Sequence, residues 1–264
     1  MISIIKNTSA SQISLDDLIV YLDKNVDFNC QNSILSSAEY FGRLFLNKNL
    51  LQIYILKELK GGLRNFESEN KYTPPSIMLH ASEKYLIRAN LWRPVKQYTQ
   101  SDINLYGLAH DHNFDFLTLN YKGPGYTSKM YTYDYKSLEG IVGEPVVLRD
   151  NGILKMEEGD MYLYRKNYDV HSQLPPEENS ITLNLMASLP KHYHTMQYIF
   201  DVKKKEISKV YGNFYSKKHI FDMAELLDDD ECNEVLQHIH KITRCEKTQH
   251  YINAIFGRKT AKIP

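Results

Sequence analysis

The stretch that decides the fold begins at Gly107 and ends at Gly123, and it reads Gly107-Leu-Ala-His110-Asp-His112-Asn-Phe-Asp-Phe116-Leu-Thr-Leu-Asn-Tyr-Lys-Gly123. Side chains two apart on a β-strand point to the same face, so this pattern predicts that His110 and His112 point the same way. Two neutral imidazoles on one face suit a divalent metal ion, and a third ligand must come from another strand. Phe114 and Phe116 share this parity and are expected to wall the cavity.

A second stretch supplies the third histidine, and it reads Glu158-Gly159-Asp160-Met-Tyr-Leu-Tyr-Arg-Lys-Asn-Tyr-Asp-Val-His171. Together the two stretches resemble the two sequence motifs of the cupin superfamily, over roughly residues 76–200. The spacing from His110-x-His112 to Gly123 matches the first motif, but Phe116 stands where the family has a metal-binding Glu. The second motif keeps its Gly and its His one residue further apart, and lacks the Pro and Gly between them.

The resemblance implies a mainly β fold with flanking helices, namely a cupin-like double-stranded β-helix barrel of six to eight strands. It also implies one divalent metal ion at the centre of the barrel, bound by His110, His112 and His171. Without the Glu ligand, this centre resembles the three-histidine centre of thiol dioxygenases, which bind iron(II), a chelating substrate and O2 together. The implied metal is Fe(II), although imidazole ligands by themselves suit iron, zinc, nickel and copper alike.

The predicted function is that of a non-haem iron oxygenase or dioxygenase acting on a small polar metabolite, such as an amino acid derivative. Its partners are then the small-molecule substrate and O2. Two alternatives stay open, because a cupin fold does not fix an activity. One is a non-oxidative lyase or isomerase that uses the metal as a Lewis acid, and the other is a non-catalytic, ligand-binding cupin.

Three further side chains are predicted to serve the reaction. Arg88 shares a strand face with Asn90 and Trp92 and is a candidate clamp for a substrate carboxylate; the alternative is a surface Arg on an outer strand. Tyr162 and Tyr164 share a face that leads toward a loop carrying His171. Either one is a candidate for a position near the metal, with core packing as the alternative role.

Other metal-binding patterns are weaker. Asp115 is an alternative ligand only if a bulge turns it to the face of His112. A 2-oxoglutarate-dependent oxygenase would need a different ligand pattern and a basic residue soon after the distant His, so no 2-oxoglutarate is expected. Two more His-x-His pairs occur, at His192-x-His194 and His238-x-His240. The latter falls in a predicted helix, where side chains two apart diverge.

The regions on both sides of the predicted barrel have helical patterns. Residues 1–70 form a predicted N-terminal helical segment, in which Ser14 resembles an N-cap, and residues 65–75 resemble a linker. Residues 76–215 form the predicted barrel, and residues 216–264 a C-terminal helical segment. The N-terminal helices are expected either to cover the open end of the barrel or to mediate a homodimer.

Composition excludes several classes of protein. The 264 residues contain 32 Lys and Arg against 32 Asp and Glu, so the basic surplus of a nucleic-acid-binding protein is missing. No segment approaches the ~18 uninterrupted apolar residues of a membrane span. The three Cys match no zinc or disulfide pattern, which favours a reducing compartment. We therefore expect a cytoplasmic protein that binds neither nucleic acid nor membrane.

Overall fold

The computed structural model describes residues 4–62, 76–97, 106–189, 195–211, 213–243 and 245–260. The chain divides into two compact units. The first unit contains residues 1–134 and 147–189, and the second contains residues 135–146 and 190–264. The boundaries of these two units therefore differ from the segment boundaries that the sequence patterns predict. That the three predicted segments fold as independent domains stays a prediction; they are residues 1–70, 76–215 and 216–264.

The described part of the first unit contains nine strands in two antiparallel sheets. They are β1 (Ser76–Ala81), β2 (Tyr85–Trp92), β3 (Ala109–His110), β4 (Phe116–Lys122), β5 (Thr127–Thr132), β6 (Arg149–Lys155), β7 (Met161–Tyr164), β8 (Asp169–Leu174) and β9 (Ser180–Ala187). The first sheet has the order β1-β2-β9-β4-β7, and within this unit the second sheet has the order β3-β8-β5-β6.

The strand pairing defines the fold. Strand β2 pairs with β9, β3 with β8, β4 with β7 and β5 with β6, all antiparallel. The eight strands are thus one long two-stranded ribbon folded back at β5–β6, and its successive pairs alternate between the two sheets. A ribbon wound in this way is a double-stranded β-helix, the two-sheet jelly-roll arrangement of cupins. The predicted mainly β fold with flanking helices is confirmed.

In the described part of the chain the two sheets of this double-stranded β-helix stay separate and face each other. At the edge of β7, the backbone of Ile5 bridges Met161. Their N–H and C=O groups exchange hydrogen bonds of 2.8 and 2.9 Å. This short segment therefore covers an edge that would otherwise be open to another strand.

The two faces of the first sheet carry different side chains. Residues of one parity, including Ile87, Leu117 and Leu185, belong to a core shared with the N-terminal helices. Residues of the other parity, including Trp92, Phe116 and Tyr164, belong to a second core with Met130 of β5. The second core lies between the two sheets, so the alternation of the sequence separates an outer face from an interior.

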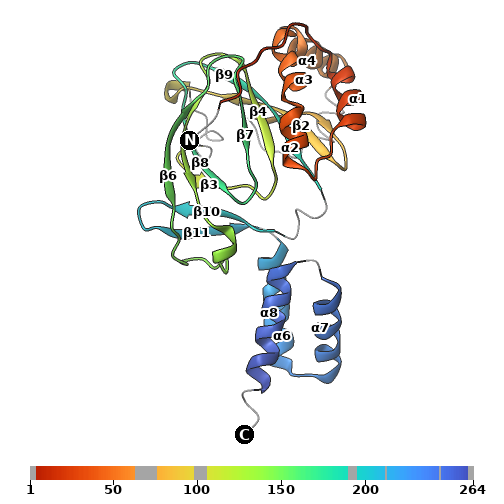
Figure 1. The fold of residues 1–264 in the computed structure, drawn as a ribbon, viewed down its shortest axis with the longest axis vertical. Helices are drawn as coiled ribbons and strands as arrows, with labels where there is room; N and C mark the ends of the chain where they lie inside the picture. Colours follow the sequence, from red (N-terminus) through yellow and green to blue (C-terminus); the bar gives the residue numbers. More distant parts are fainter. Residues whose placement is uncertain are drawn as a thin grey trace. The chain divides into compact units, whose positions relative to one another are not determined.

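The N-terminal helices cover the outer face of the first sheet (Figure 1). They are α1 (Leu15–Asn25), α2 (Gln31–Ser36), α3 (Ala38–Gly42), the 3-10 turn η1 (Arg43–Leu46) and α4 (Leu50–Lys60); a further 3-10 turn, η2 (Val95–Gln97), follows β2. The predicted cap at Ser14 is confirmed, because its side chain accepts a hydrogen bond of 3.1 Å from the Asp17 N–H. The expectation that these helices close the barrel end is wrong, because their buried apolar stripes face the sheet.

Gly123 shows why the first motif needs glycine at its end. Its φ is +86°, in the left-handed region that glycine adopts at low cost. A Cβ atom at this position would also lie 2.5 Å from the carbonyl oxygen of Asn179. The turn after β4 therefore excludes other residue types by both conformation and space.

The second unit contains a β-hairpin and the C-terminal helices. Strands β10 (Gln197–Asp201) and β11 (Glu206–Tyr211) pair antiparallel, and η3 (Tyr135–Ser137) belongs to the same unit. The helices are α6 (Asn213–Leu227), α7 (Asp230–Ile242) and α8 (Glu246–Thr260), which share a small core that includes Phe221, Leu236 and Ile252. Among the described residues, no helix combines the length and apolarity that crossing a membrane requires.

Candidate metal centre

The His-x-His pair lies where β3 ends. Strand β3 consists of Ala109 and His110 alone, and His112 lies in the loop of residues 111–115 that precedes β4. The prediction that both side chains project from one strand is therefore wrong for His112. The two rings nevertheless come together, with centroids 5.0 Å apart and planes inclined by 79°.

His171 lies on β8 directly beside His110. The prediction that a loop carries His171 is wrong, but its role as the third member of the group is confirmed by position. His110, His112 and His171 form a group whose ligand nitrogens all lie within 4.8 Å of one another. We call these three residues the histidine cluster. It contains no carboxylate among the described residues.

The geometry of the cluster fits one bound cation. The Nε2 atom of His171 lies 3.1 Å from Nε2 of His110 and 3.2 Å from Nε2 of His112. Two metal–nitrogen bonds of about 2.1 Å that meet at about 90–110° span about 3.0–3.4 Å, which includes both distances. A ring nitrogen carries one lone pair or one proton, so one imidazole cannot satisfy several nitrogen neighbours by hydrogen bonding. The residues present therefore fit a divalent metal ion.

The protonation state of the cluster also suits metal binding. Nδ1 of His110 lies 2.9 Å from the carbonyl oxygen of Leu108, which can only accept a hydrogen bond. Nδ1 therefore carries the proton and donates it, which leaves the lone pair of Nε2 for a metal. Burial lowers the pKa of all three histidines, and the positive charge of Arg88 lowers each pKa further. The imidazoles are thus neutral near pH 7, the state in which they bind metals.

Aromatic side chains surround the cluster. The ring of Phe116 meets that of His112 edge to face at 4.9 Å, and Phe114 lies 5.0 Å from the same ring. Both Phe residues thus contact the histidine cluster, and their role as walls of a cavity stays a prediction. Phe116 also stacks on Tyr164 at 4.6 Å, so the position that holds Glu in the cupin motif is filled here by apolar packing.

Tyr164 and Tyr162 differ in their distance from the cluster. Tyr164 is 1% exposed, and its ring lies 4.3 Å from the ring of His171. Its hydroxyl lies 3.5 Å from that of Tyr126, and burial holds its pKa well above the usual value. Tyr162 contacts Tyr164 edge to face at 4.8 Å, and burial raises its pKa to about 12. The structure thus places Tyr164 beside the cluster, with Tyr162 behind it.

Arg88 projects into the interior between the sheets. It shares its face of β2 with Trp92, which belongs to the interior core, and its side chain is partly buried. In the first sheet Arg88 pairs with Asn184, which pairs in turn with Thr118, and Thr118 with Tyr162. A row of four polar residues therefore crosses the interior face. This placement disagrees with the alternative of a surface Arg on an outer strand, since Arg88 is partly buried and shares its strand face with residues of the interior core.

Gln173 is a member of the site that the sequence reasoning missed. It lies two residues after His171 on β8 and is 6% exposed. Its Nε2 lies 3.2 Å from Nε2 of His171, while its Oε1 is buried and makes no hydrogen bond. Side-chain amide oxygen and nitrogen exchange places on a half-turn, so Gln173 can present either atom to a bound ion. Residues two apart on a strand share a face, so a strand prediction for residues 169–174 would have placed Gln173 beside His171.

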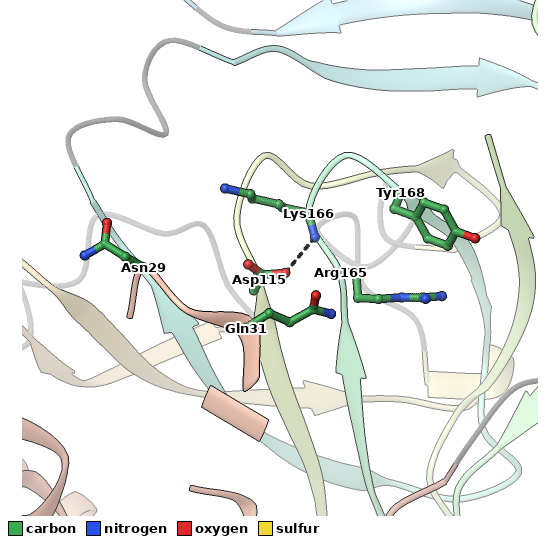
Figure 2. A pocket seen from close by; sticks show the side chains of 6 residues that line it. All are labelled: Asn29, Gln31, Asp115, Arg165, Lys166 and Tyr168. Atoms are coloured by element: carbon green, nitrogen blue, oxygen red, sulfur yellow. Dashed lines mark hydrogen bonds between the residues drawn. The ribbon is translucent and has the colours of Figure 1, made fainter. Parts of the chain in front are cut away.

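Asp115 is turned away from the cluster. Its carboxylate accepts a hydrogen bond of 3.0 Å from the backbone N–H of Lys166 (Figure 2). Asp115 instead borders a pocket of ≈ 330 Å³, lined by Asn29, Gln31, Asp115, Arg165, Lys166 and Tyr168. No residue of the histidine cluster lines this pocket. Asp115 therefore has a structural partner and is not a member of the metal-binding group.

The other two histidine pairs give no further site. His238 and His240 lie on α7, as predicted from the sequence, and belong to no potential metal-binding group among the described residues. His192 and His194 lie outside the described residues.

Comparison with solved structures gives several distant matches. A hydroquinone 1,2-dioxygenase, solved with Cd2+ and 4-hydroxybenzonitrile, matches with 13% identity over 47% of this chain and 71% of its own, at a TM-score of 0.32. The DMSP lyase DddQ of Ruegeria pomeroyi matches with 12% identity over 42% of this chain and 45% of its own, at a TM-score of 0.26. A protein of Klebsiella pneumoniae with a double-stranded β-helix domain matches with 11% identity over 47% of this chain and 83% of its own, at a TM-score of 0.26.

No protein-family model and no curated protein matches the chain. The assignment of the fold rests on the pairing of strands β2 to β9 alone. The chain has the double-stranded β-helix fold of cupins, with a three-histidine cluster between its sheets.

Proposed function

We propose that this protein is a metal-dependent oxygenase or dioxygenase in which His110, His112 and His171 hold one Fe(II) ion. The observation that carries the proposal is the convergence of three neutral Nε2 atoms, at 3.1 and 3.2 Å, without a carboxylate. Three neutral ligands leave the full charge of the ion for substrate and O2, which a bound iron(II) brings together at adjacent positions.

The surrounding residues support a small polar substrate. Arg88 supplies positive charge on the interior face, next to the polar side chains of Asn184 and Thr118. We assign Arg88 the role of binding an anionic group of the substrate. Phe114, Phe116 and Tyr164 exclude water around the cluster, which strengthens this electrostatic interaction. The proposed partners are thus a small-molecule substrate and O2; a homodimer and a cytoplasmic location stay predictions.

Metal analysis and O2 uptake test the proposal. Protein purified without chelators is expected to contain about one iron per chain, and His112→Ala and His171→Ala are expected to lose it. A panel of small carboxylates and amino acid derivatives should include a compound that causes iron-dependent O2 uptake. Arg88→Ala is expected to raise the KM for that compound, since it removes the counter-charge, and to leave the iron content unchanged.

Different outcomes point to different functions. Tightly bound zinc without O2 uptake across the panel would support a non-oxidative lyase or isomerase, or a ligand-binding protein, in place of the oxygenase. Full metal retention in both histidine variants would contradict the metal site itself. Those two results are separable, because the first concerns the reaction and the second concerns the ligands.

A further inference from the structure

The loop that carries His112 is held by residues that lie outside the histidine cluster. Residues 111–115 form no regular structure, so the position of His112 depends on side-chain and turn contacts. A metal site needs its ligands held close to their binding geometry, because a mobile ligand lowers affinity. The contacts of this loop therefore bear directly on the proposed metal site.

The turn between β7 and β8 contacts the loop at three points. The N–H of Asn167 donates to the carbonyl oxygen of His112 at 2.7 Å, and the N–H of Lys166 donates to the carboxylate of Asp115 at 3.0 Å. The side-chain amide of Asn167 lies 3.4 Å from the carboxylate of Asp111. Figure 2 shows the contact between Lys166 and Asp115.

The conformation of this turn is itself fixed. Asn167 has a φ of +50°, a region that Asn tolerates better than most residues. At the base of the turn, the N–H and the guanidinium of Arg165 donate three hydrogen bonds of 2.7–2.9 Å to the carboxylate of Asp169. The backbone N–H and the side-chain amide of Asn167 therefore point toward the loop of residues 111–115 in a defined direction.

Asp111 joins this turn to strand β5. Its side chain is 0% exposed, and its carboxylate accepts a hydrogen bond of 2.6 Å from the hydroxyl of Tyr133, just after β5. Asp111 stands between His110 and His112 in the sequence, yet it is not a member of the potential metal-binding group. A buried carboxylate with charge-assisted hydrogen bonds is a strong local anchor.

We propose that Asp111, with Tyr133 and Asn167, positions His112 for metal binding without touching the metal. This inference rests on the proposed function, because it assumes that the histidine cluster binds a metal ion. Asp111 anchors the backbone between the ligands His110 and His112. The hydroxyl of Tyr133, just after β5, holds the Asp111 carboxylate in place. The N–H of Asn167 holds His112 through the His112 carbonyl oxygen. These three are positioning residues of the site.

Titration of the metal-free full chain with Co2+ tests the proposal. Calorimetry gives the Kd, and the visible absorption of bound Co2+ reports its ligand geometry. Asp111→Asn and Tyr133→Phe are each expected to raise the Kd by about 10- to 100-fold, the range for residues that orient a metal ligand, and to change the Co2+ spectrum. Lys166→Ala is the matched control, because it keeps the backbone N–H that bonds Asp115 and should bind Co2+ like the unaltered chain.

The measurements are made at a temperature where the metal-free variants are fully folded, as judged by the fluorescence of Trp92. A merely structural role would lower the melting temperature and leave the Kd and the spectrum unchanged. Should Asp111→Asn fail to fold, Tyr133→Phe still answers the question, because it removes a single hydroxyl. Unaltered affinity and spectrum in the folded variants, with binding lost in His171→Ala, would overturn the inference alone. Unaltered binding in His171→Ala would instead overturn the metal site.

Discussion

At the scale of single residues, the histidine cluster differs from the cupin pattern at one position. The motif places Glu where this chain has Phe116, and Phe116 packs against both His112 and Tyr164. The cluster therefore contains no fixed negative charge, and all three imidazoles are neutral because burial lowers their pKa. The amide of Gln173 lies outside the histidine cluster, with its Nε2 3.2 Å from Nε2 of His171.

Gln173→Glu is predicted to raise the affinity for Co2+ or Zn2+ by about 10-fold or more. The substitution keeps the shape of the side chain and adds a negative charge close to the bound ion, which attracts it strongly in a partly buried site. Gln173→Ala is the control and should bind the metal no more tightly than the unaltered chain. Competition titration with a chelator measures both constants. Equal affinities in the two variants would mean that residue 173 does not face the metal.

The sequence indicated the histidine cluster but not every side chain beside it. His110, His112 and His171 could be identified because the spacing of their motif residues is informative even without knowledge of the strands. Gln173 was missed because His171 was assigned to a loop. Strand β8 reads Asp-Val-His-Ser-Gln-Leu, and its polar residues are buried, so apolar alternation could not reveal it. Strand β8 is buried because it lies inside its sheet, where it pairs with β3 on one side and with β5 on the other.

At the scale of secondary structure, elements with a clear apolar pattern were predictable. Strands β2 and β7 carry such a pattern, since each alternates between the outer core and the interior. Strand β6 lacks one, because it is an exposed edge strand with few apolar side chains. The layer of N-terminal helices was predicted as helical, but its packing on the outer face of the first sheet depends on contacts far apart in the sequence.

Leu22→Ala is predicted to lower the free energy of unfolding of the first unit by about 2–5 kcal/mol. Leu22 of α1 is 0% exposed within the core shared by helices and sheet, so truncation leaves a cavity. Val20 of the same helix is 50% exposed, and Val20→Ala should change the same quantity by no more than about 0.5 kcal/mol. Urea unfolding followed by Trp92 fluorescence measures both. Similar losses in the two variants would contradict the packing of α1 on the sheet.

At the scale of the whole molecule, the metal site lies entirely within one compact unit. All three histidines fall in residues 1–134 and 147–189. Their ligand nitrogens come together only when β3 and β8 pair, so the site does not exist in the unfolded chain. A ligand that binds only the folded state stabilises that state by mass action. Metal binding and the folding of the first unit are therefore linked.

Metal addition is predicted to raise the stability of the first unit. Free metal at 100 times its Kd should add about 2.7 kcal/mol to the free energy of unfolding, and removal of the metal with a chelator should reverse the change. Trp92 is the single Trp of the chain and lies in the first unit, so its fluorescence follows this transition specifically. His171→Ala should show no response, because two imidazoles hold the ion far more weakly than three. An equal response in His171→Ala would show that the stabilising metal binds elsewhere, which makes this measurement a direct test of whether the histidine cluster is the metal site.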